Sequence, residues 1–161
     1  MYLKRFGRWI VSRFFRKKKK IDKVIFHCAA TPDADESDER WFNLDIDEID
    51  RWHKARGWKG VGYHFFIKRD GTIQAGRSIG DMGAHTKGEN HNIGVCYAGS
   101  YIPTKSQVES MRELCDALRD SYGLNVYDWY CHNEFANKDC PGFDRDTLIH
   151  LLKGADIDHL L

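Results

Sequence analysis

The apolar and polar positions along the chain follow two periods, and each period predicts a kind of element. Short runs that are nearly continuous or alternate in polarity predict strands. These runs cover residues 23–29, 63–68, 72–75 and 93–98. The Arg69-Asp70-Gly71 sequence between the second and third runs predicts a hairpin turn. Residues 31–43 are acidic and show no period, so we expect a surface loop there.

Three other segments carry apolar residues at helical spacing, with signals at their ends. Aspartate and threonine side chains accept hydrogen bonds from the first N–H groups of a helix, and glycine readily adopts the left-handed conformation that ends one. The start signals are Asp45, Asp144 and Thr104, which Gln107 completes to a capping box; the stop signals are Gly57 and Gly123. Strands alternating with helices predict an α/β protein with a single mixed central β-sheet flanked by helices.

Charge divides the chain into two parts. The 161 residues have a formal net charge of +1, yet ten of the 25 Lys and Arg residues and one of the 24 acidic residues lie within residues 1–23. A basic arm therefore precedes an acidic body. We expect the arm to cover residues 1–21 and one domain to cover residues 22–161. A domain of that length buries enough surface to fold without disulfide bonds or structural metals.

The arm has the pattern of an amphipathic cationic helix, with an apolar arc opposite basic residues and a run of four lysines after it. Such a helix suits an anionic membrane or lipopolysaccharide, because each basic residue near anionic lipid contributes about 1 kcal/mol. The expected contacts are Phe6, Trp9, Lys17, Lys18, Lys19 and Lys20. Packing on the acidic body, unspecific contact with nucleic-acid phosphates and an inert tail are the alternatives.

Two other classes of segment are not expected. The longest apolar run in the arm covers residues 9–11, too short for a secretory signal peptide, and no run in the chain approaches the roughly 20 residues of a membrane-spanning helix. The five cysteines are odd in number and lack the spacing of a zinc finger or a disulfide framework. We expect reduced thiols, of which one or two could bind a metal.

Three residues have the side chains of a catalytic zinc site. His27 lies near the end of the first predicted strand, and His132 and Cys140 flank a seven-residue loop that can fold back on itself. Two ligands from one loop and a third from a strand would leave the fourth zinc position open for water. The alternative from spacing alone is a hydrogen-bonded core histidine and a buried cysteine.

Residues 76–92 form a long glycine-rich loop, and loops of this length inside a domain are often functional.

Several motifs, in order along the chain, resemble one family. They lie in residues 24–31, 52–58, 62–71, 75–77, 83–88, 90–96 and 132–141. They resemble the zinc-dependent N-acetylmuramoyl-L-alanine amidases of the phage T7 lysozyme type, which are related to animal peptidoglycan recognition proteins. The resemblance covers residues 22–153 and identifies residues 22–161 as a zinc amidase domain. Residues 90–94 are one residue shorter than the family pattern, so we expect the local loop geometry to differ from it.

The resemblance implies a function and a set of site residues. One Zn²⁺ would be held by His27, His132 and Cys140, with Tyr63 and Lys138 as catalytic partners. The reaction would be hydrolysis of the amide between N-acetylmuramic acid and L-alanine, with bacterial peptidoglycan as the partner. His85 and Thr86 match positions that line the family's substrate cleft. Glu134 is close to His132 in sequence, but we expect it to be solvated or to hydrogen-bond to a metal ligand and not to act as the general base.

Three other functions remain open. Some relatives bind peptidoglycan without cutting it, but these typically lack the cysteine ligand that Cys140 would supply. A polymerase regulator acting through the arm and a cysteine hydrolase using Cys28 or Cys131 are the others. The amidase reading implies an endolysin, expected to be monomeric and without specific nucleic-acid binding. It would accumulate in the host cytoplasm without a signal peptide and act on the cell wall at lysis.

Overall fold

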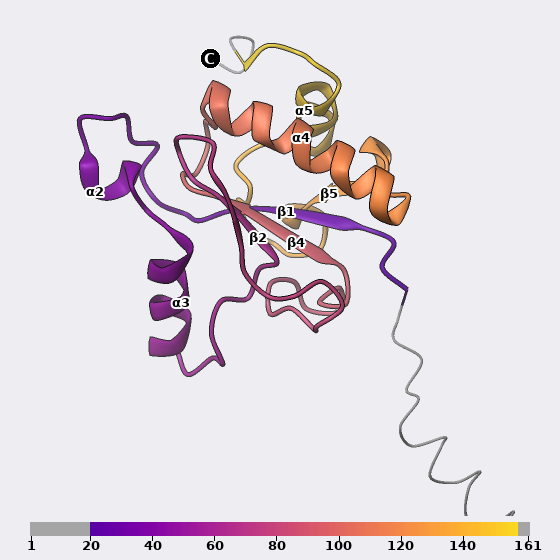
Figure 1. The fold of residues 1–161 in the computed structure, drawn as a ribbon, viewed down its shortest axis with the longest axis horizontal. Coiled ribbons are helices and arrows are strands. Elements are labelled where there is room, and N and C mark those ends of the chain that lie inside the picture. Colours follow the sequence, from indigo (N-terminus) through magenta and orange to yellow (C-terminus); the bar gives the residue numbers. More distant parts are fainter. Residues whose placement is uncertain (1–19, 158–161) are drawn as a thin grey trace, which may run out of the picture.

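The computed structural model describes residues 20–157, which form a five-stranded mixed sheet with helices on both faces (Figure 1). The strands are β1 (Val24–Cys28), β2 (Phe65–Ile67), β3 (Ile73–Ala75), β4 (Ile93–Tyr97) and β5 (Trp129–Cys131). Their order across the sheet is β3-β2-β4-β1-β5. All neighbouring pairs are parallel except β2 and β3, which form the antiparallel hairpin that the sequence predicts. The expected mixed α/β sheet is therefore confirmed.

Helices α4 (Lys105–Tyr122) and α5 (Arg145–Leu152) cover one face of the sheet, and α3 (Ile46–Ala55) packs on the other. The capping box at Thr104 is present, and Gly123 ends α4 in the left-handed conformation. Asp45 caps α3, and Asp144 caps α5. These helix ends agree with the sequence because each depends on side chains within one turn of the cap.

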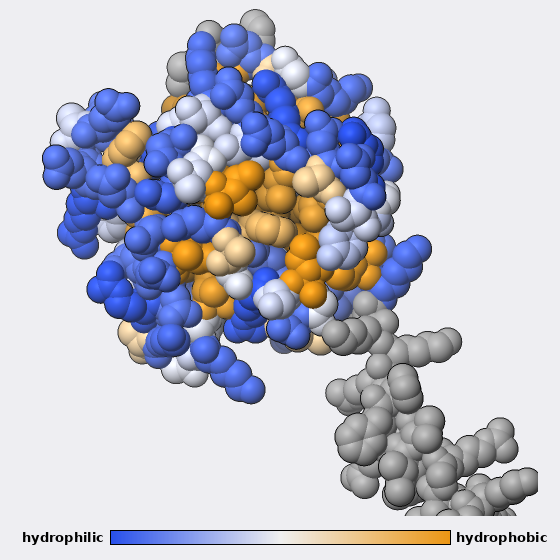
Figure 2. Space-filling model, viewed as in Figure 1, coloured by the Kyte–Doolittle hydropathy of each residue, from blue (hydrophilic) through white to orange (hydrophobic). Residues whose placement is uncertain are grey.

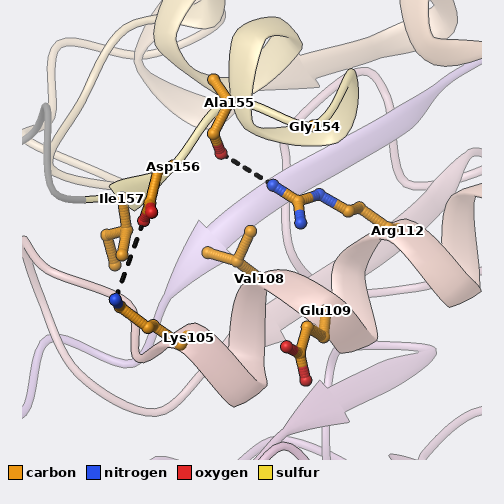
Figure 3. A pocket seen from close by; sticks show the side chains of 8 residues that line it. All are labelled: Lys105, Val108, Glu109, Arg112, Gly154, Ala155, Asp156 and Ile157. Carbon is orange, nitrogen blue, oxygen red and sulfur yellow. Dashed lines mark hydrogen bonds and ion pairs between the residues drawn. The ribbon is translucent and has the colours of Figure 1, made fainter.

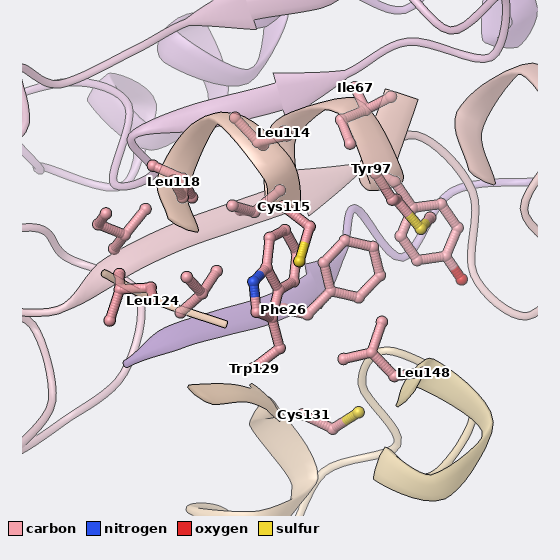
Figure 4. Packing of buried hydrophobic residues seen from close by; sticks show 14 of the residues in the cluster. Phe26, Ile67, Tyr97, Leu114, Cys115, Leu118, Leu124, Trp129, Cys131 and Leu148 are labelled. Atoms are coloured by element: carbon pink, nitrogen blue, oxygen red, sulfur yellow. The ribbon is translucent and has the colours of Figure 1, made fainter. Parts of the chain in front are cut away.

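The larger core lies between the sheet and the α4 and α5 pair (Figure 4). Phe26 of β1 stacks on Tyr97 with ring centroids 5.5 Å apart, and Trp129 packs on Phe26 at 6.1 Å. Leu114 and Leu148 bring the two helices onto these rings. Because strand side chains alternate between faces, this packing turns the odd-numbered residues of β1 toward α3. His27 is one of them.

One sequence prediction about elements is wrong, and one strand is missed. Residues 31–43 are not irregular throughout, because α2 (Glu39–Phe42) forms one turn within them. Residues 129–131 form a fifth strand in a segment for which no strand is predicted. Both elements are too short to show a hydrophobic period, and β5 exists because it pairs with β1. The predicted strand over residues 63–68 is shorter than expected, so Tyr63 precedes β2.

Apolar side chains gather on the face of the molecule below α4 (Figure 2). A groove near the start of the described chain is lined by Lys20, Ile21, Gly80, Asp81, Met82, His91, Ser121 and Tyr122. Among residues 20–157, none of the helices combines the length and the apolar character that crossing a bilayer needs. The amphipathic helix that we expect in the arm lies outside the described residues, as do its expected contacts Phe6, Trp9, Lys17, Lys18 and Lys19.

Candidate active site

The structure brings His27, His132 and Cys140 together on the α3 side of the sheet. One possible ligand atom from each residue lies within 4.8 Å of the others. The two imidazole rings are 4.4 Å apart between centroids, and Sγ of Cys140 is 3.9 Å from Nδ1 of His27. His27 is 1% exposed and His132 is 9% exposed. The cluster therefore has the three side chains and the low solvent exposure that a metal centre requires.

Strand β1 positions His27. It lies between β4 and β5, and pairs His27 with Cys96 on β4. Phe26 and Cys28 on either side of it point into the larger core, so their burial fixes His27 on the opposite face. A shift of one residue in the register of β1 would turn the imidazole away from the cluster.

The segment after β5 supplies the other two residues. His132 begins the 3₁₀ turn η2 (His132–Glu134) directly after the strand. The backbone N–H of Asn133 donates to the carbonyl of Cys140 at 2.8 Å, which closes the loop as the sequence predicts. The hydroxyl of Tyr97 donates to the carbonyl of Pro141 at 2.8 Å and ties the loop to β4. Glu134 accepts from the N–H of Cys131 at 2.7 Å, so it stabilises the turn.

The spacing of the cluster fits zinc. Zinc bonds of about 2.0–2.1 Å to nitrogen and 2.3 Å to sulfur, at a tetrahedral angle, separate the two ligand atoms by about 3.6 Å. The separation between Nδ1 of His27 and Sγ of Cys140 is 3.9 Å. A set of two imidazoles and one thiol also favours zinc over magnesium or calcium, which prefer oxygen ligands. The residues therefore fit the metal in number, chemistry and distance.

The surroundings of the cluster control its protonation. Burial lowers the pKa of His27 well below its usual value, and the neighbouring His85, His132 and Lys138 charges lower it further. Burial, together with the charge of Lys138, also lowers the pKa of His132. A hydrogen bond with the Cys28 thiol and burial raise the pKa of Cys140. Both imidazoles are thus held neutral, as metal ligands must be, whereas Cys140 must lose a proton to bind a metal.

Tyr63 and Lys138 lie beside the cluster. The rings of Tyr63 and His27 are 5.2 Å apart between centroids. Burial and nearby thiols raise the pKa of Tyr63 well above its usual value, so its hydroxyl stays protonated and can donate. Lys138 is exposed on the loop between His132 and Cys140, near enough for its charge to act on both histidines. A hydroxyl and an ammonium group therefore border the same site.

His85 and Thr86 are also in the site, but one side-chain polar atom of each faces His27. Nδ1 of His85 is 3.2 Å from Nε2 of His27, and Oγ1 of Thr86 is 3.3 Å from the same nitrogen. Thr86 is 3% exposed. The prediction that these two residues contact substrate stays a prediction.

Two residues near the site have a role that the sequence does not single out. His53 is 6% exposed, accepts from the N–H of Gly62 at 3.0 Å, and packs on Tyr63 with ring centroids 5.6 Å apart. Its helical spacing beside Trp52 signals burial but not contact with Tyr63. Asn92 is fully buried, and its side chain accepts from the N–H groups of Asp22 and Lys23. The shortened loop thus ends on a residue that fixes the start of β1.

A hollow between α4 and residues 154–157 lies elsewhere (Figure 3). Arg112 crosses it and donates to the carbonyls of Leu151 and Ala155, both at 2.7 Å. Lys105 reaches Asp156 on the other side at 4.0 Å. These contacts fasten the end of the described chain to α4, so the hollow is structural and contains none of the candidate site residues.

A mixed α/β sheet that carries two histidines and a cysteine on one face, beside a tyrosine and a lysine, has the arrangement of a metal-dependent hydrolase. The model of the N-acetylmuramoyl-L-alanine amidase family, Amidase_2, matches residues 17–143. The endolysin of Escherichia phage T7 is 40% identical over 139 residues, which cover 81% of this chain and 86% of that protein. The chain therefore belongs to the N-acetylmuramoyl-L-alanine amidase family.

Solved structures agree. N-acetylmuramoyl-L-alanine amidase LysC from Clostridium intestinale URNW superposes with a TM-score of 0.71 at 27% identity, covering 86% of this chain and 89% of that one. Peptidoglycan recognition protein LE, known from Drosophila melanogaster, superposes with a TM-score of 0.64 at 25% identity, covering 75% and 74%; that structure contains tracheal cytotoxin, a monomeric diaminopimelic acid-type peptidoglycan. The protein is a peptidoglycan-hydrolysing amidase, and its family is generally zinc-dependent.

Proposed function

We propose that the protein is an endolysin that cleaves the amide between N-acetylmuramic acid and L-alanine, and that His27, His132 and Cys140 would hold the single Zn²⁺ it uses. The observation that carries this proposal is the convergence of those three side chains within 4.8 Å. When bound, zinc supplies a Lewis acid for the scissile carbonyl and lowers the pKa of a water ligand toward neutrality. Three protein ligands would leave a coordination position open to water or substrate.

The chain's own residues supply the remaining stabilisation. During attack on an amide, negative charge develops on the carbonyl oxygen, and donors aimed at that oxygen lower the barrier. Lys138 brings a positive charge on the loop that also carries His132 and Cys140. Tyr63 brings a neutral hydroxyl whose raised pKa keeps it a donor. We assign both to this oxygen, each with an effect of a few kcal/mol on the barrier.

The substrate is bacterial peptidoglycan, at the point where a stem peptide joins the glycan strand. Tracheal cytotoxin in the similar peptidoglycan recognition protein LE structure is a fragment of this polymer, which supports the choice of substrate class. His85 and Thr86 would meet the substrate through ring and methyl surfaces, because both ring nitrogens of His85 and the hydroxyl of Thr86 are engaged within the protein.

We also propose that residues 1–21 form a cationic arm that binds anionic membrane or lipopolysaccharide, with residues 22–161 as the amidase domain. The support is the concentration of basic and aromatic residues in the arm. The enzyme would accumulate in the host cytoplasm and act on the wall at lysis, as a monomer. Deleting residues 1–20 should reduce sedimentation with vesicles containing anionic lipid; unchanged binding would contradict this role.

Digestion of purified peptidoglycan tests the assigned bond. Mass spectrometry of the soluble products should find free stem peptides that begin with L-alanine. Glycan fragments with new reducing ends, or cuts within the stem peptide, would assign another bond and refute the proposal. Folded, zinc-loaded protein that releases nothing would favour a binding role instead.

A further inference from the structure

The histidine that follows Ala84 in the glycine-rich loop is linked to the proposed metal ligand on β1. Nδ1 of His85 lies 3.2 Å from Nε2 of His27, and the other nitrogen of the same ring, Nε2, lies 3.2 Å from the carbonyl oxygen of Asn92. These contacts form a chain from a backbone carbonyl, through one imidazole, to another. The far nitrogen of His27, Nδ1, faces Sγ of Cys140.

The positions of the protons along this chain follow from its fixed end. A carbonyl oxygen only accepts, so Nε2 of His85 carries the ring proton and Nδ1 of His85 carries the free electron pair. That nitrogen is therefore an acceptor, and a proton on Nε2 of His27 gives the contact between the two rings a donor. A neutral imidazole has one N–H, so Nδ1 of His27 is left with a free electron pair on the side of the cluster.

We propose that His85 is a positioning residue that holds His27 in the tautomer whose Nδ1 binds the metal. This role rests on the proposed zinc centre and adds to it the residue that prepares one of its ligands. It differs from the expected role in substrate contact, because both ring nitrogens of His85 are used within the protein.

Thr86 supports the same tautomer. Its hydroxyl lies 3.1 Å from Nδ1 of His85 and 3.3 Å from Nε2 of His27. The hydroxyl can donate to His85 while it accepts from His27. Whether the His27 proton goes to the His85 nitrogen or to this oxygen, it stays on Nε2. Two acceptors thus favour the same tautomer of His27.

The loop and β4 form a slot that holds the His85 ring. A Cβ atom on Gly94 would lie 2.6 Å from the imidazole carbons, and one on Gly83 would lie 2.5 Å from Cδ2. Any side chain at either position would therefore displace the ring. The backbone N–H groups of His85 and Thr86 both donate to Oδ1 of Asn90, at 2.7 and 2.8 Å, which fixes the backbone on the other side. The ring has little freedom to leave His27.

Metal affinity tests this role without relying on activity. Zinc dissociation constants would be measured by competition with a chromophoric chelator for the wild type, His85→Leu and His85→Asn. The Asn oxygen is as many bonds from the backbone as Nδ1 of His85 and can accept, whereas the Leu methyl group cannot. We expect about 10- to 100-fold weaker zinc binding for His85→Leu and a value within about threefold of the wild type for His85→Asn. His150→Ala, on the exposed side of α5, is the control.

A second measurement needs no variant. Two-bond ¹H–¹⁵N correlation spectra of the zinc-loaded wild type should show the His27 ring proton on Nε2 and the metal on Nδ1. A proton on Nδ1, or equal zinc affinity for the wild type and a folded His85→Leu protein, would overturn the role of His85 and leave the zinc centre intact. A wild type that binds no zinc would overturn the zinc centre and this role together.

Discussion

The backbone N–H of Cys28 donates to Sγ of Cys140 at 3.3 Å, although 112 residues separate the two in sequence. The bond joins the end of β1 to the loop that follows β5. A donor aimed at sulfur favours the thiolate, which is the form that binds a metal. The same strand that carries His27 therefore also orients the sulfur that the proposed centre uses.

Replacing this sulfur should remove the metal. Cys140→Ser keeps the size of the side chain but offers a hydroxyl, which zinc binds poorly. We expect the bound zinc, measured by elemental analysis after dialysis, to fall well below one equivalent, and activity to fall by about 100-fold or more. Cys115→Ala, in the core of α4, should keep both. A Cys140→Ser protein with full zinc and full activity would exclude Cys140 as a ligand.

Lys138 should act on the reaction and not on metal retention. Its ammonium stabilises negative charge on the substrate oxygen, so Lys138→Ala should lower kcat by about 10²- to 10³-fold with little change in KM. Zinc content should be unchanged. Steady-state kinetics on a soluble muropeptide would measure this, with Lys59→Ala, an exposed lysine after α3, as the control. A loss of zinc that accounts for the whole effect would argue against the role.

The hydroxyl of Tyr63 is expected to contribute less than the lysine, because it is neutral. Tyr63→Phe keeps the ring that packs on His27 and His53 and removes only the donor. We expect kcat to fall about 10- to 100-fold while the midpoint of thermal unfolding stays close to that of the wild type. Tyr127→Phe, at an exposed position, is the matched control. Wild-type kcat in Tyr63→Phe would assign the hydroxyl no part in catalysis.

The buried histidines should make the free energy of unfolding of the metal-free protein depend on pH. Burial lowers the pKa of His85 to about 4 and that of His27 and His132 below their usual value. Since the unfolded histidines have the higher pKa, the unfolded state binds protons first as pH falls below about 6.5. The contribution is therefore fully present above that pH and is lost as pH falls toward 4.

Urea unfolding of the metal-free protein measures this loss. His85 alone should lower the free energy of unfolding by about 1–2 kcal/mol between pH 7 and pH 5. His150→Ala should show the same loss, because His150 is exposed. Equal or greater stability at pH 5 would mean that the buried rings do not titrate as their surroundings imply.

Much of the fold can be predicted because its signals are local. The caps at Asp45, Thr104 and Asp144 act within one helical turn, and the apolar run of β1 marks a strand that is buried on both faces. The strand β5 could not be predicted, since three residues hold no period and their conformation depends on pairing with β1. Local sequence does not encode such a partner.

The candidate site also contains residues that the sequence can identify and a contact that it cannot. His27, His132 and Cys140 can be proposed as ligands from motifs, but the contact between His27 and His85 depends on how a loop 58 residues away lies on β4. The absence of a side chain at Gly94 creates the space for that ring. The sequence shows a glycine at this position without showing what fills the space.

Metal removal and reconstitution during peptidoglycan digestion test the central claim most directly. Wild-type protein stripped with a chelator should release no stem peptides, and one equivalent of Zn²⁺ should restore the release of peptides that begin with L-alanine. The same treatment of Cys140→Ser should restore nothing. Release of those peptides by stripped protein that holds no measurable metal would contradict a zinc centre at His27, His132 and Cys140.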